Sequence, residues 1–151
     1  MAEDLAELLN GLRDGWNEAM GLWLVRATAD EVVAELEVGP QHRQAYGIVH
    51  GGVHAGIIET VASIGAALHA LPRGQSVVGL ENHTSFLHAV REGKLKVVAR
   101  PLTRGRRSQL WEGTVSDATD RLVARGTVRL LCLEADVELA GEKVDSRLKA
   151  P

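Results

Sequence analysis

The sequence of 151 residues has one cysteine, little net charge and no long apolar run. Because Cys132 is the single cysteine, no disulfide can form within the chain, and this cysteine content suits a reducing compartment. A formal net charge of −3 gives no reason to expect a nucleic-acid partner. No run of about 18 apolar residues is present, and the start, Met-Ala-Glu-Asp, lacks the basic region of a secretory signal. We therefore expect a cytoplasmic protein that does not span a membrane.

Apolar periodicity divides the chain into one long helix and several strands. Residues 51–68 have the three- and four-residue spacing of a helix. The strand-like segments are 21–27, 31–38, 76–87, 94–103, 107–117 and 122–133. A shorter amphipathic helix is expected at residues 3–19, and residues 135–151 read as a charged, peripheral or disordered tail. This order predicts a single α+β domain over residues 1–134, with a mostly antiparallel sheet around the long helix.

One charged residue interrupts the long helix. Apolar residues form a stripe along one side: Val53, Ile57, Val61, Ile64 and Leu68. Small residues occupy the other side: Gly52, Ala55, Gly56, Ala62, Ser63 and Ala66. Glu59 lies among these small residues, on a helix that should be buried on both sides. Because a buried carboxylate without a partner is costly, Glu59 either has a structural partner or serves chemistry.

The start of this helix offers backbone donors. His50-Gly51-Gly52 places two glycines where the first N–H groups of a helix lack acceptors. Such an end favours an anion or a polarised carbonyl oxygen. Gly51 lies roughly 12 Å along the axis from Glu59, so the two cannot both reach one carbonyl within about 3.5 Å. Two antiparallel helices related by a two-fold axis would bring Gly51 of one subunit to Glu59 of the other. We therefore expect a homodimer with composite sites.

The same stretch resembles a known family. Its pattern is Gln44-x-x-Gly47-x-x-His50-Gly51-Gly52, followed by Glu59 and Ser63. The similarity continues through residues 78–86, 91–93 and 105–111 and covers about residues 20–134. These segments resemble the hotdog-fold acyl-CoA thioesterases, in the glutamate-type branch that includes 4-hydroxybenzoyl-CoA thioesterase and the phenylacetate-pathway enzymes. The resemblance implies an α+β hotdog fold, in which a mostly antiparallel sheet wraps a long central helix.

The resemblance also implies hydrolysis of an acyl-CoA, with an aromatic acyl group favoured, to a free acid and coenzyme A. Glu59 would be the nucleophile or general base, and the Gly51 N–H would polarise the thioester carbonyl. The other residues carried over would orient the carbonyl or the leaving thiolate (Gln44, His50), hold the water (Ser63), line the acyl pocket (Asn82, His83, Thr84) and bind the coenzyme A phosphates (Arg106, Arg107, His88, Arg91). The family implies no metal or redox cofactor, and a homotetramer built from two dimers.

Other interpretations stay open. Structural hydrogen bonds or packing are the alternative explanation for each of these polar residues. His50 and His54 have a spacing found among zinc ligands, but Gly51 stands where an H-E-x-x-H motif has its glutamate. Two functions besides hydrolysis remain: an acyl-CoA-binding module without catalysis, and a dehydratase acting on enoyl or hydroxyacyl thioesters. Dehydratase chemistry usually uses an aspartate–histidine pair, which is not evident on this helix.

Overall fold

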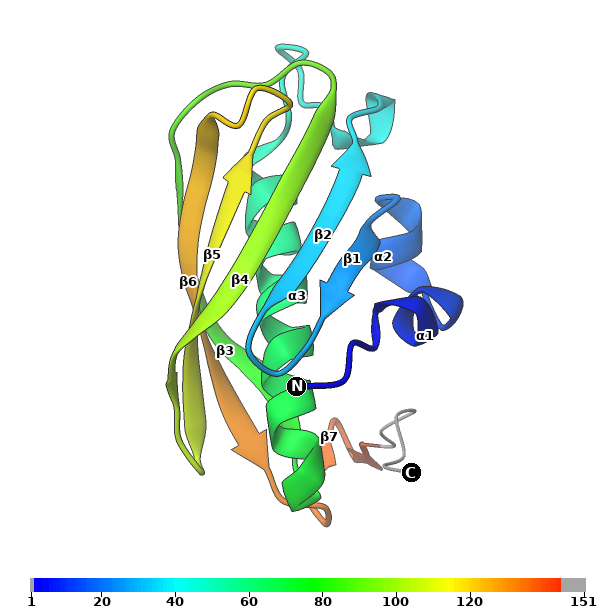
Figure 1. The fold of residues 1–151 in the computed structure, drawn as a ribbon, viewed down its shortest axis with the longest axis vertical. Helices are drawn as coiled ribbons and strands as arrows, with labels where there is room; N and C mark the ends of the chain where they lie inside the picture. The colour runs from blue at the N-terminus through cyan, green and yellow to red at the C-terminus, as the bar shows by residue number, and fades with distance from the viewer. Residues whose placement is uncertain (1, 145–151) are drawn as a thin grey trace.

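The computed structural model describes residues 2–144 of the chain. Within this part, a helix of 20 residues, α3 (Gly51–Ala70), packs along a six-stranded antiparallel sheet (Figure 1). The strands are β1 (Trp23–Ala27), β2 (Val32–Glu37), β3 (Ser76–Phe86), β4 (Lys94–Arg104), β5 (Ser108–Ser116) and β6 (Leu122–Leu133). Their order in the sheet is β1-β2-β4-β5-β6-β3. The predicted α+β fold, a long helix held by an antiparallel sheet, is confirmed.

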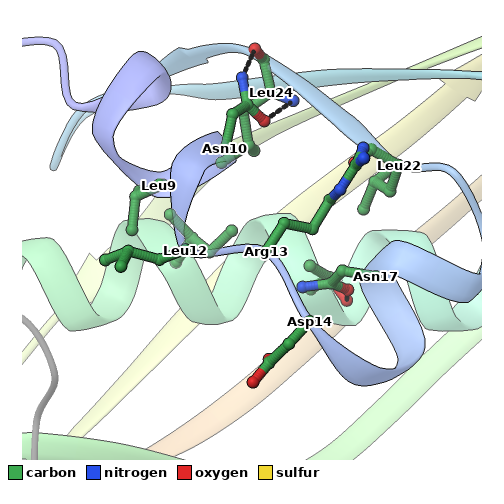
Figure 2. A pocket seen from close by; sticks show the side chains of 10 residues that line it. Leu9, Asn10, Leu12, Arg13, Asp14, Asn17, Leu22 and Leu24 are labelled. Carbon is green, nitrogen blue, oxygen red and sulfur yellow. Dashed lines mark hydrogen bonds between the residues drawn. The ribbon is translucent and has the colours of Figure 1, made fainter.

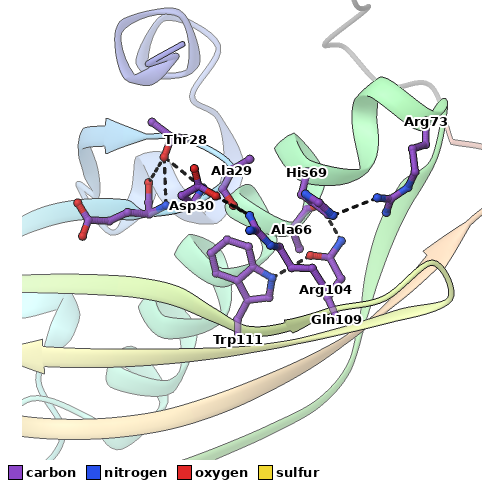
Figure 3. Close-up of polar contacts among 10 residues, drawn as sticks. Thr28, Ala29, Asp30, Ala66, His69, Arg73, Arg104, Gln109 and Trp111 are labelled. Carbon is purple, nitrogen blue, oxygen red and sulfur yellow. Dashed lines mark hydrogen bonds and ion pairs between the residues drawn. The ribbon is translucent and has the colours of Figure 1, made fainter. Parts of the chain in front are cut away.

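Contacts with β5 fix the C-terminal half of α3 on the sheet. The Trp111 ring lies so close to the helix backbone that a Cβ on Gly65 would overlap it. The indole Nε1 of Trp111 donates to Gln109 Oε1 at 2.9 Å, and Gln109 Nε2 donates to the Ala66 carbonyl oxygen at 3.0 Å (Figure 3). All the polar atoms of this buried group are therefore used within the fold, which makes it a structural anchor.

The N-terminal segment forms two short helices, α1 (Ala6–Gly11) and α2 (Gly15–Ala19). The prediction of one helix over residues 3–19 is therefore wrong. Gly15 has a φ of +55°, a left-handed conformation that a continuous right-handed helix cannot contain. Asn10 ties α1 to β1, because its side chain donates to the Leu24 carbonyl oxygen and accepts from the Leu24 N–H, both at 2.9 Å (Figure 2).

Short elements complete the described chain. Two 3-10 turns, η1 (Pro40–His42) and η2 (Leu71–Arg73), flank the long helix in the sequence. After β6, an exposed hairpin forms from β7 (Glu138–Leu139) and β8 (Glu142–Lys143). The last part of the expected tail, residues 145–151, lies outside the described residues.

The segment Gly51–Arg73 is long and apolar enough to pass a test for a membrane span, with a mean hydropathy of 1.3. Its apolar content has a structural explanation. Ile57, Ile58 and Val61 are fully buried in the core beneath the sheet, where apolar residues are required in any globular fold. The hydropathy of this segment is therefore that of a core helix.

β3 forms one edge of the sheet. Among the described residues it pairs with β6 on one side only. It is 11 residues long, and two of its apolar side chains are more than half exposed, Leu80 at 57 % and Phe86 at 58 %. A long edge strand with unpaired backbone groups and exposed apolar side chains is a template for pairing with another chain. The open edge of β3 is therefore a candidate surface for pairing with a second copy of the chain.

Candidate active site

The N-terminus of α3 opens into a cavity of about 430 Å³ lined by Gln44, His50 and Gly51. Among the described residues, none accepts a hydrogen bond from the Gly51 N–H. His50 Nδ1 accepts from the Gly52 N–H at 2.8 Å, so the neutral ring carries its proton on Nε2. Gln44 Oε1 accepts from the Tyr46 N–H, which leaves the Gln44 amide nitrogen as a donor. The structure therefore brings three predicted site residues together as N–H donors on one cavity.

A tight turn positions Gln44. The Gln44 N–H donates to the Ile48 carbonyl oxygen, and the Gly47 N–H donates to the Gln44 carbonyl oxygen, both at 2.9 Å. Gly47 has a φ of +75°, which favours glycine at this position. Arg91 Nη1 donates to the Tyr46 carbonyl oxygen at 2.7 Å. Arg91, predicted to bind phosphate, therefore holds the turn that carries Gln44.

Glu59 lines a second cavity of about 310 Å³ further along α3, together with Gly52 and Gly56. Its side chain is exposed and, within residues 2–144, forms no hydrogen bond or ion pair. Gly79 of β3 lies beside it, since a Cβ there would be 3.1 Å from Glu59 Oε1. The expected burial of both sides of α3 is therefore wrong for the single chain, because its own sheet leaves the Glu59 side uncovered. Ser63 is half-buried one turn later.

The donors and the carboxylate do not meet within one chain. Gly51 lies against Phe86 near the end of β3, since a Cβ on Gly51 would be 2.7 Å from the Phe86 ring. Glu59 lies against Gly79, near the start of β3. A straight helix separates the two α3 residues by roughly 12 Å. The two halves of the predicted site thus lie apart, as expected from the sequence.

Two of the predicted acyl-pocket residues have structural bonds. Asn82 Nδ2 donates to the Ala55 carbonyl oxygen of α3 at 2.9 Å, and Thr84 Oγ1 donates to Asn82 Oδ1 at 2.6 Å. His83 is exposed between them. None of these three residues lines the two cavities described above. The hydrogen bonds show that Asn82 ties β3 to the helix, while contact with an acyl group stays a prediction.

The four predicted phosphate ligands lie at opposite ends of α3. His88 lines the cavity at the N-terminus of the helix, close to Arg91 in sequence. Arg106 and Arg107 lie in the turn between β4 and β5, near the C-terminus of α3 (Figure 1). Because 20 helical residues span roughly 30 Å, one chain cannot bring all four to a single nucleotide. Within one chain, His88 and Arg91 therefore lie at one end of the helix and Arg106 and Arg107 at the other, and phosphate binding by any of the four stays a prediction.

His54 is a buried cavity residue that was not among the predicted site residues. Its side chain is 3 % exposed, lies with its ring 6.3 Å from that of Phe86, and lines the donor cavity. Its Nδ1 has no hydrogen-bond partner among the described residues. Burial lowers the pKa of His54 below its ordinary value of 6.5, so the ring is neutral at pH 7. The four-residue spacing from His50 was the available signal, because i and i+4 share one helix face.

The buried His54 is expected to make folding stability fall in mild acid. Its pKa is lower in the folded chain than in the unfolded chain, so the unfolded chain binds more protons between the two values. The free energy of unfolding therefore decreases as the pH falls through about 6.5. In His54→Leu this loss should be smaller, measured by urea denaturation between about pH 7 and pH 5. An unchanged pH dependence would show that the ring protonates without penalty.

His69, on the same helix, contributes to acid sensitivity in the same direction. Burial, followed by the charges of Arg104 and Arg73, lowers the pKa of His69. Arg73 Nη1 lies 3.0 Å from its Nε2, and Arg104 is bonded to Asp30 (Figure 3). The His54 variant should therefore reduce the pH dependence without abolishing it.

A zinc site at the start of α3 gains no support. Within residues 2–144, no group of three or more histidine, cysteine, aspartate or glutamate side chains has an arrangement that could hold a metal ion. The Nδ1 atom of His50 is used as a cap for the Gly52 N–H.

Comparison with known proteins gives consistent matches. A model of the thioesterase superfamily matches residues 46–124. Rv1847 of Mycobacterium tuberculosis, a provisionally named esterase, is 44 % identical over 122 residues, which cover 80 % of this chain and 87 % of that protein. Its solved structure has a TM-score of 0.78 at 43 % identity, over 81 % of this chain and 98 % of that chain.

Two further relatives have more specific names. The 1,4-dihydroxy-2-naphthoyl-CoA hydrolase of Listeria monocytogenes is 33 % identical over 109 residues, or 72 % of this chain and 88 % of that protein. The structure of the thioesterase HI1161 of Haemophilus influenzae has a TM-score of 0.82 at 28 % identity, over 88 % of this chain and 93 % of that chain. With the family model matching more than half of its length, the chain belongs to the thioesterase superfamily of hotdog-fold thioester hydrolases.

Proposed function

We propose that this enzyme hydrolyses an acyl-CoA with an aromatic acyl group to the free acid and coenzyme A. The observation that carries the proposal is one cavity at a helix N-terminus lined by three residues that each have an N–H donor, Gln44, His50 and Gly51. The aromatic substrate class is supported by the glutamate-type pattern of the sequence. It is also supported by the relative whose name is 1,4-dihydroxy-2-naphthoyl-CoA hydrolase.

In this proposal the donor cavity binds the thioester carbonyl. The carbonyl oxygen lies at the Gly51 N–H, where the helix dipole favours negative charge. Charge develops on this oxygen when the carbonyl carbon becomes tetrahedral, so donors already in place lower the barrier. His50 Nε2–H and the Gln44 amide are the additional donors, for the same oxygen or for the departing thiolate. The reaction needs no metal or redox cofactor.

Glu59 promotes the attack on the thioester carbonyl carbon by one of two routes. As a general base it takes a proton from water, the hydroxide adds to the carbonyl carbon, and the C–S bond breaks to release the thiolate. As a nucleophile its carboxylate adds to the carbonyl carbon and expels the thiolate, and water then hydrolyses the mixed anhydride. Ser63, one turn after Glu59, would hold the water in either route. Both routes end in the same acid and thiol.

The composite site requires a dimer, and the β3 edge supports one. Gly79 lies beside Glu59, and Phe86 lies beside Gly51. If β3 pairs with its own copy about a two-fold axis near Asn82, Gly79 lies opposite the partner's Phe86. Glu59 of one chain then approaches the partner's Gly51. The same pairing satisfies the open edge of β3 and covers the uncovered side of α3.

Assembly beyond the dimer and contacts to the nucleotide remain proposals from the family resemblance. A tetramer would contain two such dimers. His88 lies on the donor cavity. It is therefore better placed than Arg106 and Arg107 to contact a coenzyme A molecule whose thioester carbonyl is bound in that same cavity. Arg106 and Arg107 would contact only a nucleotide that extends to the C-terminal end of α3. A cytoplasmic location agrees with the single cysteine.

Thiol release from a panel of acyl-CoAs tests the proposed function. Benzoyl-, phenylacetyl-, short-chain and long-chain acyl-CoAs are incubated with the enzyme, and free coenzyme A is detected with a chromogenic thiol reagent. We expect the aromatic substrates to give the highest kcat/KM. Binding of acyl-CoA without thiol release would favour the binding module. Addition of water to crotonyl-CoA without thiol release would favour the dehydratase.

A further inference from the structure

The cavity beside Glu59 has an aromatic wall that comes from the N-terminal helices. Trp16 of α2 lines this cavity with Asn17, Gly56, Glu59 and Thr60. A Cβ on Gly56 would lie 2.6 Å from the indole ring, so the ring rests on the helix backbone at a position that admits only glycine without a shift. Trp16 is nevertheless 43 % exposed, and it keeps apolar ring surface uncovered within the chain.

Two hydrogen bonds hold α2 in this position. Thr60 Oγ1 of α3 donates to Asn17 Oδ1 at 3.2 Å, and Figure 2 shows Asn17 beside the α3 ribbon. At the other end of α2, His42 is fully buried and its Nε2 lies 2.7 Å from the Met20 carbonyl oxygen. Because His42 Nδ1 accepts from the Gly39 N–H, its Nε2 carries the proton and donates to Met20. The Trp16 indole therefore belongs to a helix, α2, that hydrogen bonds hold in place.

The indole lies within one helical turn of the candidate catalytic carboxylate. Gly52, Gly56 and Glu59 share one face of α3, and one turn rises roughly 5 Å. A thioester carbonyl attacked by Glu59 lies within about 3.5 Å of its carboxylate. The acyl atoms next to that carbonyl then fall within reach of the indole. The indole would then contact the acyl group, which is the part of the substrate that differs from one acyl-CoA to another.

We infer that Trp16 determines acyl specificity, as a flat wall on which the ring of an aromatic acyl group stacks. This inference rests on the proposed thioesterase function and names a residue outside the family pattern quoted above. Offset stacking of two rings adds to the gain from burying apolar area. A flexible acyl chain gains less from a flat wall and loses rotamer freedom when it is ordered there. Trp16 should therefore favour aromatic over aliphatic acyl groups.

The test compares Trp16→Ala and Trp16→Phe with a control tryptophan variant. Trp23 of β1 is similarly exposed, at 52 %, but lies outside the cavity, beneath the Arg13 guanidinium. For each protein, kcat/KM is measured with benzoyl-CoA and octanoyl-CoA. In Trp16→Ala we expect the benzoyl-to-octanoyl ratio to fall roughly tenfold or more, the range expected for losing a ring contact. Trp16→Phe should keep most of the ratio, and Trp23→Ala should keep all of it.

The outcomes separate this inference from the proposed function. An enzyme that hydrolyses both substrates with an unchanged ratio in Trp16→Ala would overturn the inference and leave the thioesterase function intact. An equal rise in KM for both substrates would assign Trp16 to the pantetheine arm and also overturn it. No hydrolysis by the wild type would remove the proposed function itself. Thermal unfolding checks the fold, and Trp16→Leu replaces Trp16→Ala if the smaller side chain unfolds the protein.

A second readout does not depend on turnover. In Glu59→Gln, where the substrate should stay intact, benzoyl-CoA binding is followed by tryptophan fluorescence with Trp23 replaced by phenylalanine. Stacking on Trp16 should change the emission, and the change should disappear when Trp16→Phe is added. An identical change in both proteins would place the acyl group away from Trp16.

Discussion

Glu59→Gln is expected to lower kcat for thioester hydrolysis by at least about a hundredfold while the fold stays intact. Glutamine keeps the size of the side chain but is neither a base nor a nucleophile for a thioester. The stability should hardly change, because Glu59 is exposed and, in the described part of the chain, pairs with no other group. Loss of activity without loss of stability separates a chemical role from a structural one.

The measurement combines thiol release with thermal unfolding. Glu37→Gln is the matched control, since Glu37 is an exposed glutamate on β2 outside both cavities. The control should have the kcat and melting temperature of the wild type. Equal hydrolysis by wild type and Glu59→Gln would remove Glu59 from the mechanism. A large drop in melting temperature would support the structural alternative instead.

Leu80→Glu is expected to weaken self-association and, with it, activity. Leu80 is 57 % exposed on the open edge of β3, next to Glu81. In a dimer paired along this edge, the change removes a leucine from the interface of both chains and adds a carboxylate next to Glu81 of each chain. At roughly 1.5 kcal/mol for each leucine, the loss is about 3 kcal/mol, which raises the dimer Kd by about a hundredfold.

Analytical ultracentrifugation and specific activity over a dilution series measure this effect. Activity per chain should fall on dilution as dimers dissociate, and it should recover as the protein is concentrated. Val25→Glu is the matched control, because Val25 is 51 % exposed on β1, at the opposite edge of the same sheet. A monomeric Leu80→Glu protein with full activity would show that one chain suffices for catalysis.

The secondary structure was predictable because each element buries one face. Alternation placed β2 and β6 within a residue or two of their observed ends, and three- and four-residue spacing placed α3. The break at Gly15 was not predictable from apolar spacing, because Leu12 before it and Trp16 after it keep a helical repeat while the backbone at Gly15 is left-handed. Local backbone conformation overrode the pattern there.

The site was predictable where it depends on one stretch of chain. Gln44, His50 and Gly51 are close in sequence and line one cavity. The separation of the phosphate candidates was not predictable in the same way, because β4 runs along the sheet between Arg91 and Arg106. The exposure of Glu59 also escaped prediction, since apolar spacing does not tell which face of a helix is covered by its own chain. Trp16 was taken only as part of an amphipathic helix.

Complementation between two inactive variants tests the composite site most directly. One chain carries Glu59→Gln, and the other carries Gln44→Ala with His50→Ala; the two are co-expressed with different tags, and the mixed dimer is purified. If each site takes its donors from one chain and its carboxylate from the other, one site of the mixed dimer is intact. The account predicts about half of the wild-type activity for this dimer. A mixed dimer no more active than its parents would contradict it and place each complete site within a single chain.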